Sequence, residues 1–368
     1  MREFADQVLA PRAAAYDESG TYPADNIEEL AELGLFGLTI DEEYGGSGGT
    51  ARQLAVVVEE IARGCGSTSV IYAAHLSLCA NFIHTFGTDG QKRRYVPPLA
   101  RADSIGAFAL SEPSAGSDAA ALQTSAAKSD GCYLLNGTKL FITNAVEADT
   151  FVVLATHNRK LRARGIESLV VERDSLGFQI NSQHGKMGMR ASSTAELVFK
   201  DCRVSEENRL GGEGEGFGQT MEILNSSRIS IAAQCVGLAQ AAYEASLEYA
   251  QHREIFGKQI GDFQGIQWMI ADMATNIDAA RLLVRRAATL KDMGRPYVTE
   301  ASMAKLYSSK VATDTTNKAV QIHGGTGYFA PTPVERYFRD ARVTEIYEGT
   351  SEVQRSIIAR RLFGRKGD

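Results

Sequence analysis

One glutamate near the C-terminus has the surroundings expected of a catalytic carboxylate. Glu348 lies between Tyr347 and Gly349 in the stretch EIYEGTSEVQR, just before a segment with helical periodicity. A helix N-terminus lowers the pKa of a nearby carboxyl group, whereas an apolar pocket raises it. An acid held between the two can be tuned to act as a general base. Taken alone, the stretch fits more simply a solvated turn, with Thr350 as the N-cap of the next helix.

Two further stretches carry side chains suited to a flat, polar ligand. ALSEPSAGSD, residues 109–118, gathers three serine hydroxyls and closely spaced backbone N–H groups around a proline. KLFITN, residues 139–144, places Phe141 and Thr143 on one face of an expected strand, where a ring could stack and a hydroxyl could bind. On composition alone, the first stretch fits equally a turn that ends a strand, and the second an ordinary strand.

Two glycine-rich segments do not fit a nucleotide-binding loop, and a third allows a ligand or partner to approach. GSGGTA, residues 46–51, matches a dinucleotide pattern, but DEEY separates it from the preceding apolar segment and its acids would repel a pyrophosphate. A loop between two helices is the better interpretation. GGEGEGFG, residues 211–218, is also acidic and indicates a flexible linker. HGGTGY, residues 323–328, is typical of a helix C-cap and also allows a bulky partner to approach closely.

Composition narrows the class of protein. The chain has 368 residues, of which 44% are hydrophobic and 23% charged, and its formal net charge is −6. This balance argues against a nucleic-acid partner. The five scattered cysteines indicate a reducing compartment, and the histidines lack metal-ligand spacing, so no metal is expected. Without a targeting segment or an apolar run of membrane length, we expect a soluble cytoplasmic protein with no membrane partner.

Hydrophobic periodicity changes twice along the chain and predicts three domains. Residues 1–104 indicate a helical domain, residues 105–208 a β-barrel or sandwich, and residues 209–368 an antiparallel four-helix bundle. Short β-branched runs such as FVVLATH and IESLVVERD mark the middle domain, in which Asn136-Gly137 is the predicted hairpin turn. The proline-free run that begins at GFGQTMEIL predicts one very long helix.

Six motifs together resemble one enzyme family. ALSEPSAGSD, NGTKLFITN, KMGMRASSTAELVF, REIFGKQ, QIHGGTGY and IYEGTSEVQR occur in this order. The set is similar to the acyl-CoA dehydrogenase family, above all its short-chain and short-branched-chain type, over nearly the whole chain. The resemblance implies the same three-part fold and FAD bound between the β domain and the bundle, with help from a neighbouring subunit.

The resemblance also implies which residues contact FAD. Thr143 would hydrogen-bond the flavin ring, Arg253 would hold the diphosphate, and the segment from Gln321 to Gly325 would reach the partner subunit's FAD. The family usually has threonine where Ser111 stands and tryptophan where Phe141 stands, and both replacements are mild. The full implied cofactor set is Phe108, Leu110, Ser111, Gly116, Ser117, Phe141, Thr143, Arg253, Phe256, Gln264, Gln321, Gly324, Gly325, Thr350 and Glu352.

For the substrate, the resemblance makes Glu348 the base that removes the thioester α-proton. Gly349 would lie beside the substrate carbonyl and Tyr347 against the acyl chain. Ser117, Asn225 and Arg228 would contact the pantetheine and CoA, although many relatives have aspartate at the position of Asn225. The implied reaction is FAD-dependent α,β-dehydrogenation of a short- or medium-chain, or short-branched, acyl-CoA to the trans-2-enoyl-CoA.

The resemblance implies two protein partners and leaves two other functions open. Electrons would pass to an electron-transfer flavoprotein, and the chain would form a homotetramer arranged as a dimer of dimers. One alternative is a flavin oxidase of the same fold that uses oxygen. The other is a non-catalytic flavoprotein or helical scaffold, against which the presence of Glu348 in a fully matched motif argues.

Overall fold

The N-terminal part of the chain is a group of helices, as predicted. The structure is a computed structural model that describes residues 1–364. Thr50 and Thr88 each begin a helix with a capping box, in which the threonine side chain and a glutamine three residues later satisfy each other's backbone N–H groups. The helices are α1 (Arg2–Phe4), α2 (Ala10–Ser19), α3 (Ala24–Glu32), α4 (Ala51–Gly64), α5 (Gly66–Ala73), α6 (Asn81–Phe86) and α7 (Asp89–Ala100), with π-helical segments at Ala5–Leu9 and Ala74–Ala80.

The glycine-rich segment before α4 is a loop, as the acidic residues beside it indicated. A Cβ atom at Gly46 would lie 2.1 Å from the backbone oxygen of Ile40, and one at Gly49 would lie 2.5 Å from that of Leu38. These two glycines therefore allow close packing of the chain against itself. No strand precedes them, so the strand-to-helix turn that a dinucleotide site requires is missing here.

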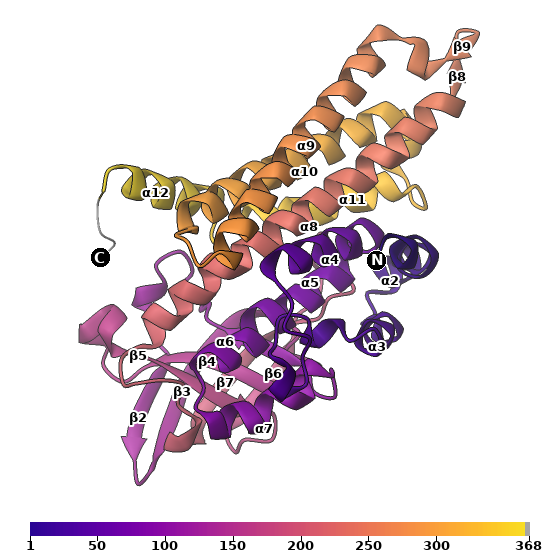
Figure 1. The fold of residues 1–368 in the computed structure, drawn as a ribbon. Helices are drawn as coiled ribbons and strands as arrows, with labels where there is room; N and C mark the ends of the chain where they lie inside the picture. The colour runs from indigo at the N-terminus through magenta and orange to yellow at the C-terminus, as the bar shows by residue number, and fades with distance from the viewer. Residues whose placement is uncertain (365–368) are drawn as a thin grey trace.

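Seven strands form one mixed, curled sheet in the middle of the chain (Figure 1). The order is β1-β4-β2-β3-β7-β6, with β5 also paired to β4; β1 and β2 run parallel to β4, and the other pairs are antiparallel. The strands are β1 (Gly106–Ala109), β2 (Ser125–Ser129), β3 (Cys132–Thr143), β4 (Thr150–Thr156), β5 (Ile166–Glu172), β6 (Phe178–Ser182) and β7 (Thr194–Ser205).

The predicted hairpin turn at Asn136-Gly137 is wrong. β3 continues through both residues, and the turn lies at Asp130-Gly131, where both residues have positive φ. Asn136 instead sits at a β-bulge against β7, where its side chain donates to Asp201 Oδ1 over 2.9 Å. A Cβ at Gly137 would lie 2.7 Å from the Cα of Thr124, so the glycine marks a close backbone approach.

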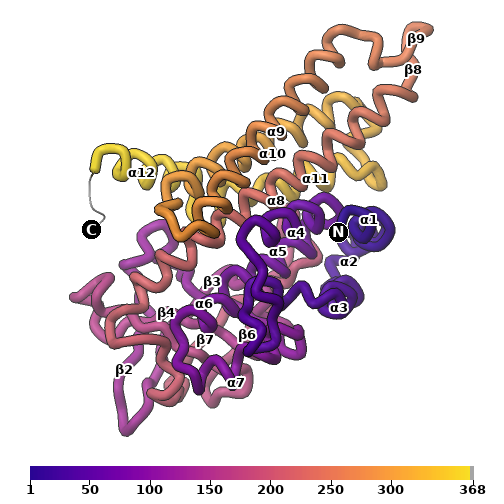
Figure 2. The backbone as a smooth tube through the Cα atoms, in the orientation of Figure 1, coloured from indigo at the N-terminus to yellow at the C-terminus, as the bar shows by residue number. Residues whose placement is uncertain are grey.

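The bundle rises away from the sheet and is built on one long helix (Figures 1 and 2). The predicted proline-free helix is uninterrupted over its 37 residues. The charged segment VERYFRDARV also forms a helix, which packs against α8 and α10, while the helix after Gly349 packs against α10. The elements are α8 (Gly216–His252), β8 (Glu254–Ile255), β9 (Lys258–Gln259), α9 (Gln264–Asp292), α10 (Val298–His323), α11 (Pro333–Arg342) and α12 (Ser351–Leu362).

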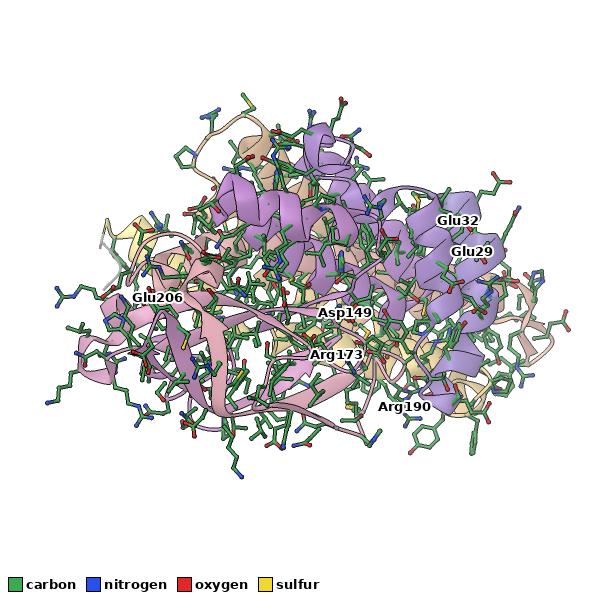
Figure 3. The ribbon with its side chains drawn as sticks, turned by 90° about the horizontal axis from the view of Figure 1, so that it is seen from below. Glu29, Glu32, Asp149, Arg173, Arg190 and Glu206 are labelled. Atoms are coloured by element: carbon green, nitrogen blue, oxygen red, sulfur yellow. The ribbon has the colours of Figure 1, made fainter. Side chains whose placement is uncertain are left out.

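The three regions share one continuous hydrophobic core. It joins the N-terminal helices, the inner face of the sheet and the near half of the bundle, and α4 and α5 pack directly against α8. Seen from below, Asp149 and Arg173 lie where the strands meet the helices, whereas Glu29 and Glu32 lie on the outer surface of α3 (Figure 3). The domain boundaries proposed at 104/105 and 208/209 fall between α7 and β1 and between β7 and α8. Among residues 1–364, no helix combines the length and apolarity needed to cross a bilayer.

A buried histidine connects the helices to the sheet and should make stability depend on pH. His75 has no exposed surface; its Nε2 lies 2.9 Å from the Leu99 carbonyl oxygen, and the Gly106 N–H donates to its Nδ1 over 3.0 Å. Burial lowers the pKa of His75 to about 4. As the pH falls, the unfolded chain therefore binds a proton at this histidine before the folded chain does. The contribution of His75 to the free energy of unfolding is fully present above the ordinary pKa near 6.5 and is lost below it.

We expect acidification from pH 6.5 to 4 to remove about 3 kcal/mol of unfolding free energy through His75 alone. Urea unfolding of the wild type and of His75→Asn at several pH values checks this. The asparagine variant should lose less stability than the wild type across that window. Equal losses in both proteins would assign the acid sensitivity to other groups.

Candidate functional site

The loop between α11 and α12 holds Glu348 in an unusual backbone conformation. Glu348 has φ +50° and Gly349 has φ +95°, both in the left-handed region. The Nε2 of Gln354 donates to the carbonyl oxygens of Gly349 over 2.9 Å and of Glu348 over 3.3 Å. Thr350 caps α12 by accepting the N–H of Val353, as predicted. The loop is therefore fixed by its own hydrogen bonds, and the uncommon φ of Glu348 marks it as a functional candidate.

The Glu348 side chain points into the protein and not into solvent. Ser227 Oγ, from the first third of α8, donates a hydrogen bond to Glu348 Oε2. Burial raises the pKa of the Glu348 carboxyl group, and the Ser227 hydrogen bond and the charges of Lys305 and Arg228 partly oppose this effect. The interpretation as a solvated turn residue is therefore wrong. A partly desolvated carboxylate of this kind is what a general base requires.

Two buried cations stand near this carboxylate. Arg228 is 3% exposed and Lys305 is 0% exposed. Burial lowers the pKa of Arg228 to about 10, although the charge of Glu348 opposes the shift. Its Nη1 donates to Asn225 Oδ1, while its Nε has no hydrogen-bond partner in residues 1–364. The structure thus brings together Asn225, Arg228 and Glu348, three of the residues proposed to contact substrate.

Tyr347 closes the inner end of the same region. Its hydroxyl donates to Gln234 Oε1, and Gln234 Nε2 donates to Ser69 Oγ over 2.6 Å. Gln234 has no exposed surface, so this chain of hydrogen bonds joins the loop to α8 and α5 in the interior. Apolar side chains from α5, α8, α10 and α11 surround the tyrosine ring; they include Val70, Ile231, Cys235, Leu238, Ala312 and Ala341.

The two other predicted ligand stretches lie side by side and are joined by a buried ion pair. Lys139 Nζ lies 2.7 Å from Glu112 Oε1 and 3.1 Å from the Leu110 carbonyl oxygen, and neither charged side chain is more than 2% exposed. The N–H of Leu140 also donates to the Ser111 carbonyl oxygen over 2.8 Å. Glu112 accepts further hydrogen bonds from the N–H groups of residues 123 and 124. The 109–118 loop is therefore anchored to β3.

The surface of this joined pair is open to a ligand. Phe141 is 68% exposed with φ +60°, and β3 is irregular against β7 between Lys139 and Ile142. Within residues 1–364 the hydroxyls of Ser111, Ser117 and Thr143 make no hydrogen bond. Unused hydroxyls beside an exposed aromatic ring suit a planar, polar cofactor such as a flavin. Phe108 lies behind them, with its ring 5.8 Å from that of Phe82.

A second group of predicted cofactor residues lies at the far end of the bundle. Arg253 and Phe256 belong to the turn around β8 and β9, which Figures 1 and 2 show at the tip, and Phe256 is 92% exposed. Arg253 lies about 39 Å along α8 from Ser227, at 1.5 Å per residue. Within a single chain, this group of predicted cofactor residues therefore lies far from Glu348. Its other members are exposed in the same way: Gln264, Gln321, Gly324 and Gly325.

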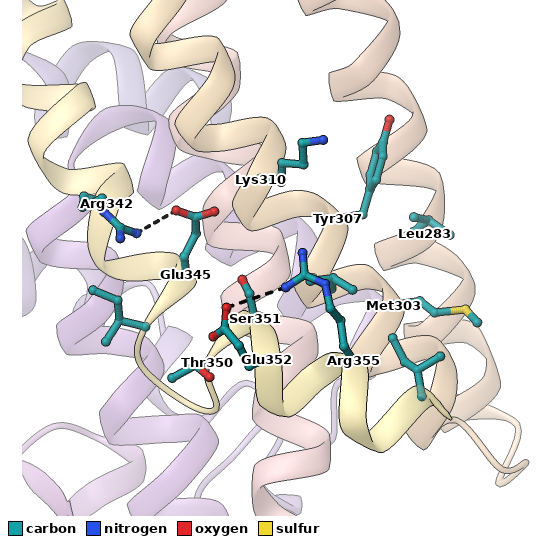
Figure 4. Close-up of a pocket in the computed structure, with 13 residues that line it drawn as sticks. Leu283, Met303, Tyr307, Lys310, Arg342, Glu345, Thr350, Ser351, Glu352 and Arg355 are labelled. Carbon is teal, nitrogen blue, oxygen red and sulfur yellow. Dashed lines mark hydrogen bonds and ion pairs between the residues drawn. The ribbon is translucent and has the colours of Figure 1, made fainter. Parts of the chain in front are cut away.

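Two predicted cofactor residues line a separate hollow of about 680 Å³ between α9, α10 and α12 (Figure 4). Thr350 and Glu352 stand on its α12 side. Glu352 lies 3.8 Å from Arg355 on α12, and Arg342 lies 2.7 Å from Glu345 at the end of α11. Leu283, Met303 and Tyr307 form the apolar wall, so the hollow is apolar on one side and charged on the other.

Several site residues were missed from the sequence. Lys305 lies on the buried stripe of α10, at helical spacing from Ala301, Ser308 and Ala312. A lysine on an otherwise small or apolar stripe could have marked it as a site residue. Glu112 and Lys139 lie within the predicted ligand stretches and have opposite charges. Gln354 and Gln234 carried no signal, because only the folded chain brings them to Glu348 and Tyr347.

A possible metal-ligand cluster is present away from this region, although none was expected. The ligand atoms of His157, Glu167 and Glu213 lie within 4.8 Å of one another. His157 Nδ1 lies 2.6 Å from Glu167 Oε1, and Glu213 pairs with Lys128 over 2.6 Å. His157 and Glu213 thus already have partners, whereas Glu167 Oε2 has no hydrogen-bond partner within residues 1–364.

A helical domain, a curled sheet and a helix bundle around a buried carboxylate define the architecture of one class of flavoprotein oxidoreductase. Residues 1–103 match the acyl-CoA dehydrogenase N-terminal domain, residues 107–202 the middle domain and residues 214–363 the C-terminal domain. The chain therefore belongs to the acyl-CoA dehydrogenase family, whose members are flavoproteins.

Individual relatives are similar over almost their full length. The short-chain-specific acyl-CoA dehydrogenase of Clostridium acetobutylicum is 46% identical over 363 residues, which cover 99% of this chain and 96% of the relative. The structure of butyryl-CoA dehydrogenase from Megasphaera elsdenii superimposes with a TM-score of 0.96 at 42% identity, covering 98% and 96% of the two chains. A chain from structural work on the electron-transferring flavoprotein of Acidaminococcus fermentans has a TM-score of 0.96 at 45% identity, covering 98% and 95%. This chain is an oxidoreductase of the same family.

Proposed function

We propose that the protein catalyses FAD-dependent α,β-dehydrogenation of a short-chain acyl-CoA, with Glu348 as the base that removes the α-proton. The observation that carries the proposal is the inward-facing, partly desolvated Glu348 carboxylate on a hydrogen-bonded loop. Its raised pKa makes it a stronger base than an exposed glutamate. The charges of Arg228 and Lys305 favour the ionised form of the carboxylate and so oppose the effect of burial on its pKa.

The chain also offers a donor for the charge that develops on the thioester oxygen. The backbone N–H of Glu348 makes no hydrogen bond within residues 1–364, and we propose that it donates to the substrate carbonyl. A preorganised N–H at the position of a growing enolate charge lowers the barrier to proton removal. The Ser227 hydrogen bond occupies Oε2 and leaves Oε1 to accept the proton.

The residues present fit FAD. Ser111, Ser117 and Thr143 have unused hydroxyls, and Phe141 has an exposed ring beside them. Bound FAD would supply the acceptor for the hydride that leaves the β-carbon. Phe108, Leu110 and Gly116 complete this side of the site, and Thr350 and Glu352 would contact the cofactor from α12.

We assign the exposed tip of the bundle to the FAD of a partner subunit. The guanidinium of Arg253 has no hydrogen bond or ion pair within residues 1–364, and Phe256 beside it is almost fully exposed. Because guanidinium groups bind phosphate oxygens through paired N–H groups, Arg253 suits the cofactor diphosphate. Gln264 and the 321–325 segment would complete the contact, which requires at least a dimer; a homotetramer is proposed.

Arg253→Ala should lower FAD retention by about tenfold or more, because one charge-assisted phosphate contact is lost. The measurement is flavin content per subunit after extensive dialysis. Arg101→Ala serves as the control, since Arg101 is also exposed and within residues 1–364 pairs with Asp103 alone. Equal flavin content in both variants would contradict the role of Arg253.

A short acyl group is proposed because hydrogen-bonded and apolar side chains occupy the interior around Tyr347. The hydrogen-bonded chain from Tyr347 through Gln234 to Ser69 crosses the space between the loop, α8 and α5. The two relatives named for short-chain and butyryl substrates point the same way. The likeness to a chain studied with an electron-transferring flavoprotein supports such a protein as the electron acceptor.

A panel of acyl-CoA thioesters of different length and branching tests the proposal through the flavin absorbance. Short straight-chain substrates should bleach the flavin without oxygen, and electron-transfer flavoprotein should restore its colour faster than air does. Rapid peroxide formation in air would favour the oxygen-using oxidase instead. A purified protein that stays colourless and binds no FAD would favour the scaffold.

A further inference from the structure

A lysine with no exposed surface lies directly behind the Glu348 loop. Lys305 stands in α10, and its Nζ donates to the Gly349 carbonyl oxygen over 2.7 Å. Among residues 1–364, no carboxylate lies within ion-pair distance of this ammonium group. Burying a lysine without a carboxylate partner costs free energy. Its presence on the buried stripe of α10 therefore needs an explanation other than stability.

The carbonyl group that Lys305 holds belongs to the residue after the proposed base. Gln354 donates to the same oxygen over 2.9 Å, so two buried donors fix the peptide plane between Gly349 and Thr350. Glu348 itself is held at φ +50°, a conformation that glutamate seldom adopts. Rotation of the fixed peptide plane would let the backbone relax and would turn the carboxylate away from Ser227.

The charged and titratable groups around Lys305 come from three sides. Glu348 and Glu345 approach from the loop, Arg228 and Cys235 from α8, and Glu352 from α12. Burial lowers the pKa of Lys305 to about 8, while the two acids and the thiol oppose the shift. At neutral pH most of the ammonium groups are therefore still charged, and this charge favours the ionised form of Glu348.

We propose that Lys305 is a positioning residue for the reaction, whose ammonium group fixes the Gly349 carbonyl and keeps the adjacent Glu348 carboxylate oriented and ionised. The α-proton still moves from substrate carbon to Glu348, and Lys305 keeps its own proton throughout. The inference rests on the proposed function, because the effect of Lys305 is exerted through Glu348 as the base.

The test compares Lys305→Met and Lys305→Arg in the holoenzyme with a short-chain acyl-CoA. Methionine keeps the length of the side chain but removes its charge and its donors. We expect Lys305→Met to retain FAD and to melt at or above the wild-type temperature, because apolar replacement of an unpaired buried charge is seldom destabilising. Its kcat should fall about 10- to 100-fold with KM changed less than about twofold. The acid limb of its kcat/KM profile should move up by about one pH unit.

Lys305→Arg should return the acid limb to its wild-type position and recover most of kcat. It should also move the loss of activity above about pH 8, where the wild-type ammonium loses its proton, to higher pH. Lys318→Met is the matched control, since Lys318 lies on the same helix and pairs with the exposed Asp272 over 3.1 Å. The control should change neither kcat nor the pH profile.

The inference is overturned if the acid limb of Lys305→Met stays at the wild-type pH, even if the rate falls. A lysine with only a structural role would lower the rate without moving the acid limb. If Lys305→Met does not fold, Lys305→Arg decides: an unchanged alkaline limb would overturn the inference. Glu348→Gln in the same assay separates the two proposals. Wild-type turnover in Glu348→Gln would refute the proposed function, whereas its loss beside a normal Lys305→Met would refute only the role of Lys305.

Discussion

Glu348→Gln should remain folded and yellow but lose at least about 10²- to 10⁴-fold in turnover of acyl-CoA, the range typical of a lost general base. Glutamine has nearly the same shape and can still accept the hydrogen bond from Ser227. It cannot accept the α-proton, so substrate should bind but the flavin should bleach very slowly. The measurement is the rate of anaerobic bleaching in a single turnover, together with flavin content.

Glu248→Gln is the control, because Glu248 is exposed on α8 and has no contact with the loop. The turnover of Glu348→Asp should lie between those of the wild type and the glutamine variant, because the aspartate side chain is one methylene shorter and its carboxylate does not reach the position beside Ser227. The wild-type kcat/KM should rise with pH through the pKa of Glu348, which burial places above the ordinary glutamate value. Near-normal turnover in Glu348→Gln would show that Glu348 is not the catalytic base.

Lys139→Met should lower the free energy of unfolding by about 3–5 kcal/mol, because it leaves the buried Glu112 carboxylate without its cation. The damage should be local to the two stretches that the pair joins, so FAD should also dissociate more readily. Urea unfolding of the apoprotein gives the stability, and flavin content after dialysis gives the second readout.

The double variant Glu112→Gln/Lys139→Met should recover much of the lost stability, because no uncompensated charge then remains buried. Lys128→Met is the matched control: Lys128 pairs with Glu213 on the surface, and its loss should cost no more than about 1 kcal/mol. If Lys139→Met is as stable as Lys128→Met, the Glu112–Lys139 pair does not stabilise the loop.

Periodicity alone predicted much of the fold. The 37-residue α8 has no proline and a sustained apolar pattern, and the change from helical to alternating periodicity marked the start of the sheet. Turn chemistry was less reliable. Asn136-Gly137 is a favoured hairpin dipeptide, but Asp130-Gly131 is another, and only the pairing of β3 with β7 selects between them.

The site could be predicted only where its residues are neighbours in sequence. Tyr347, Glu348 and Gly349 lie together in one motif, whereas Ser227 reaches Glu348 from 121 residues away. The buried pair of Glu112 and Lys139 spans two elements, and its charges could not be told from surface charges before the sheet was known. The tip of the bundle is assigned to a partner subunit only as a proposal, because a single chain does not show what this exposed tip binds.

The uninterrupted length of α8 limits which insertions and deletions the protein can accept. The helix passes the acid of its own subunit at Ser227 and ends at the arginine that we assign to a neighbour's cofactor. One residue inserted between these points would rotate one end against the other by about 100° and lengthen the rod by about 1.5 Å. An insertion of seven residues would nearly preserve the angle but not the span. The number of residues in α8 between Ser227 and Arg253 is therefore constrained at both ends.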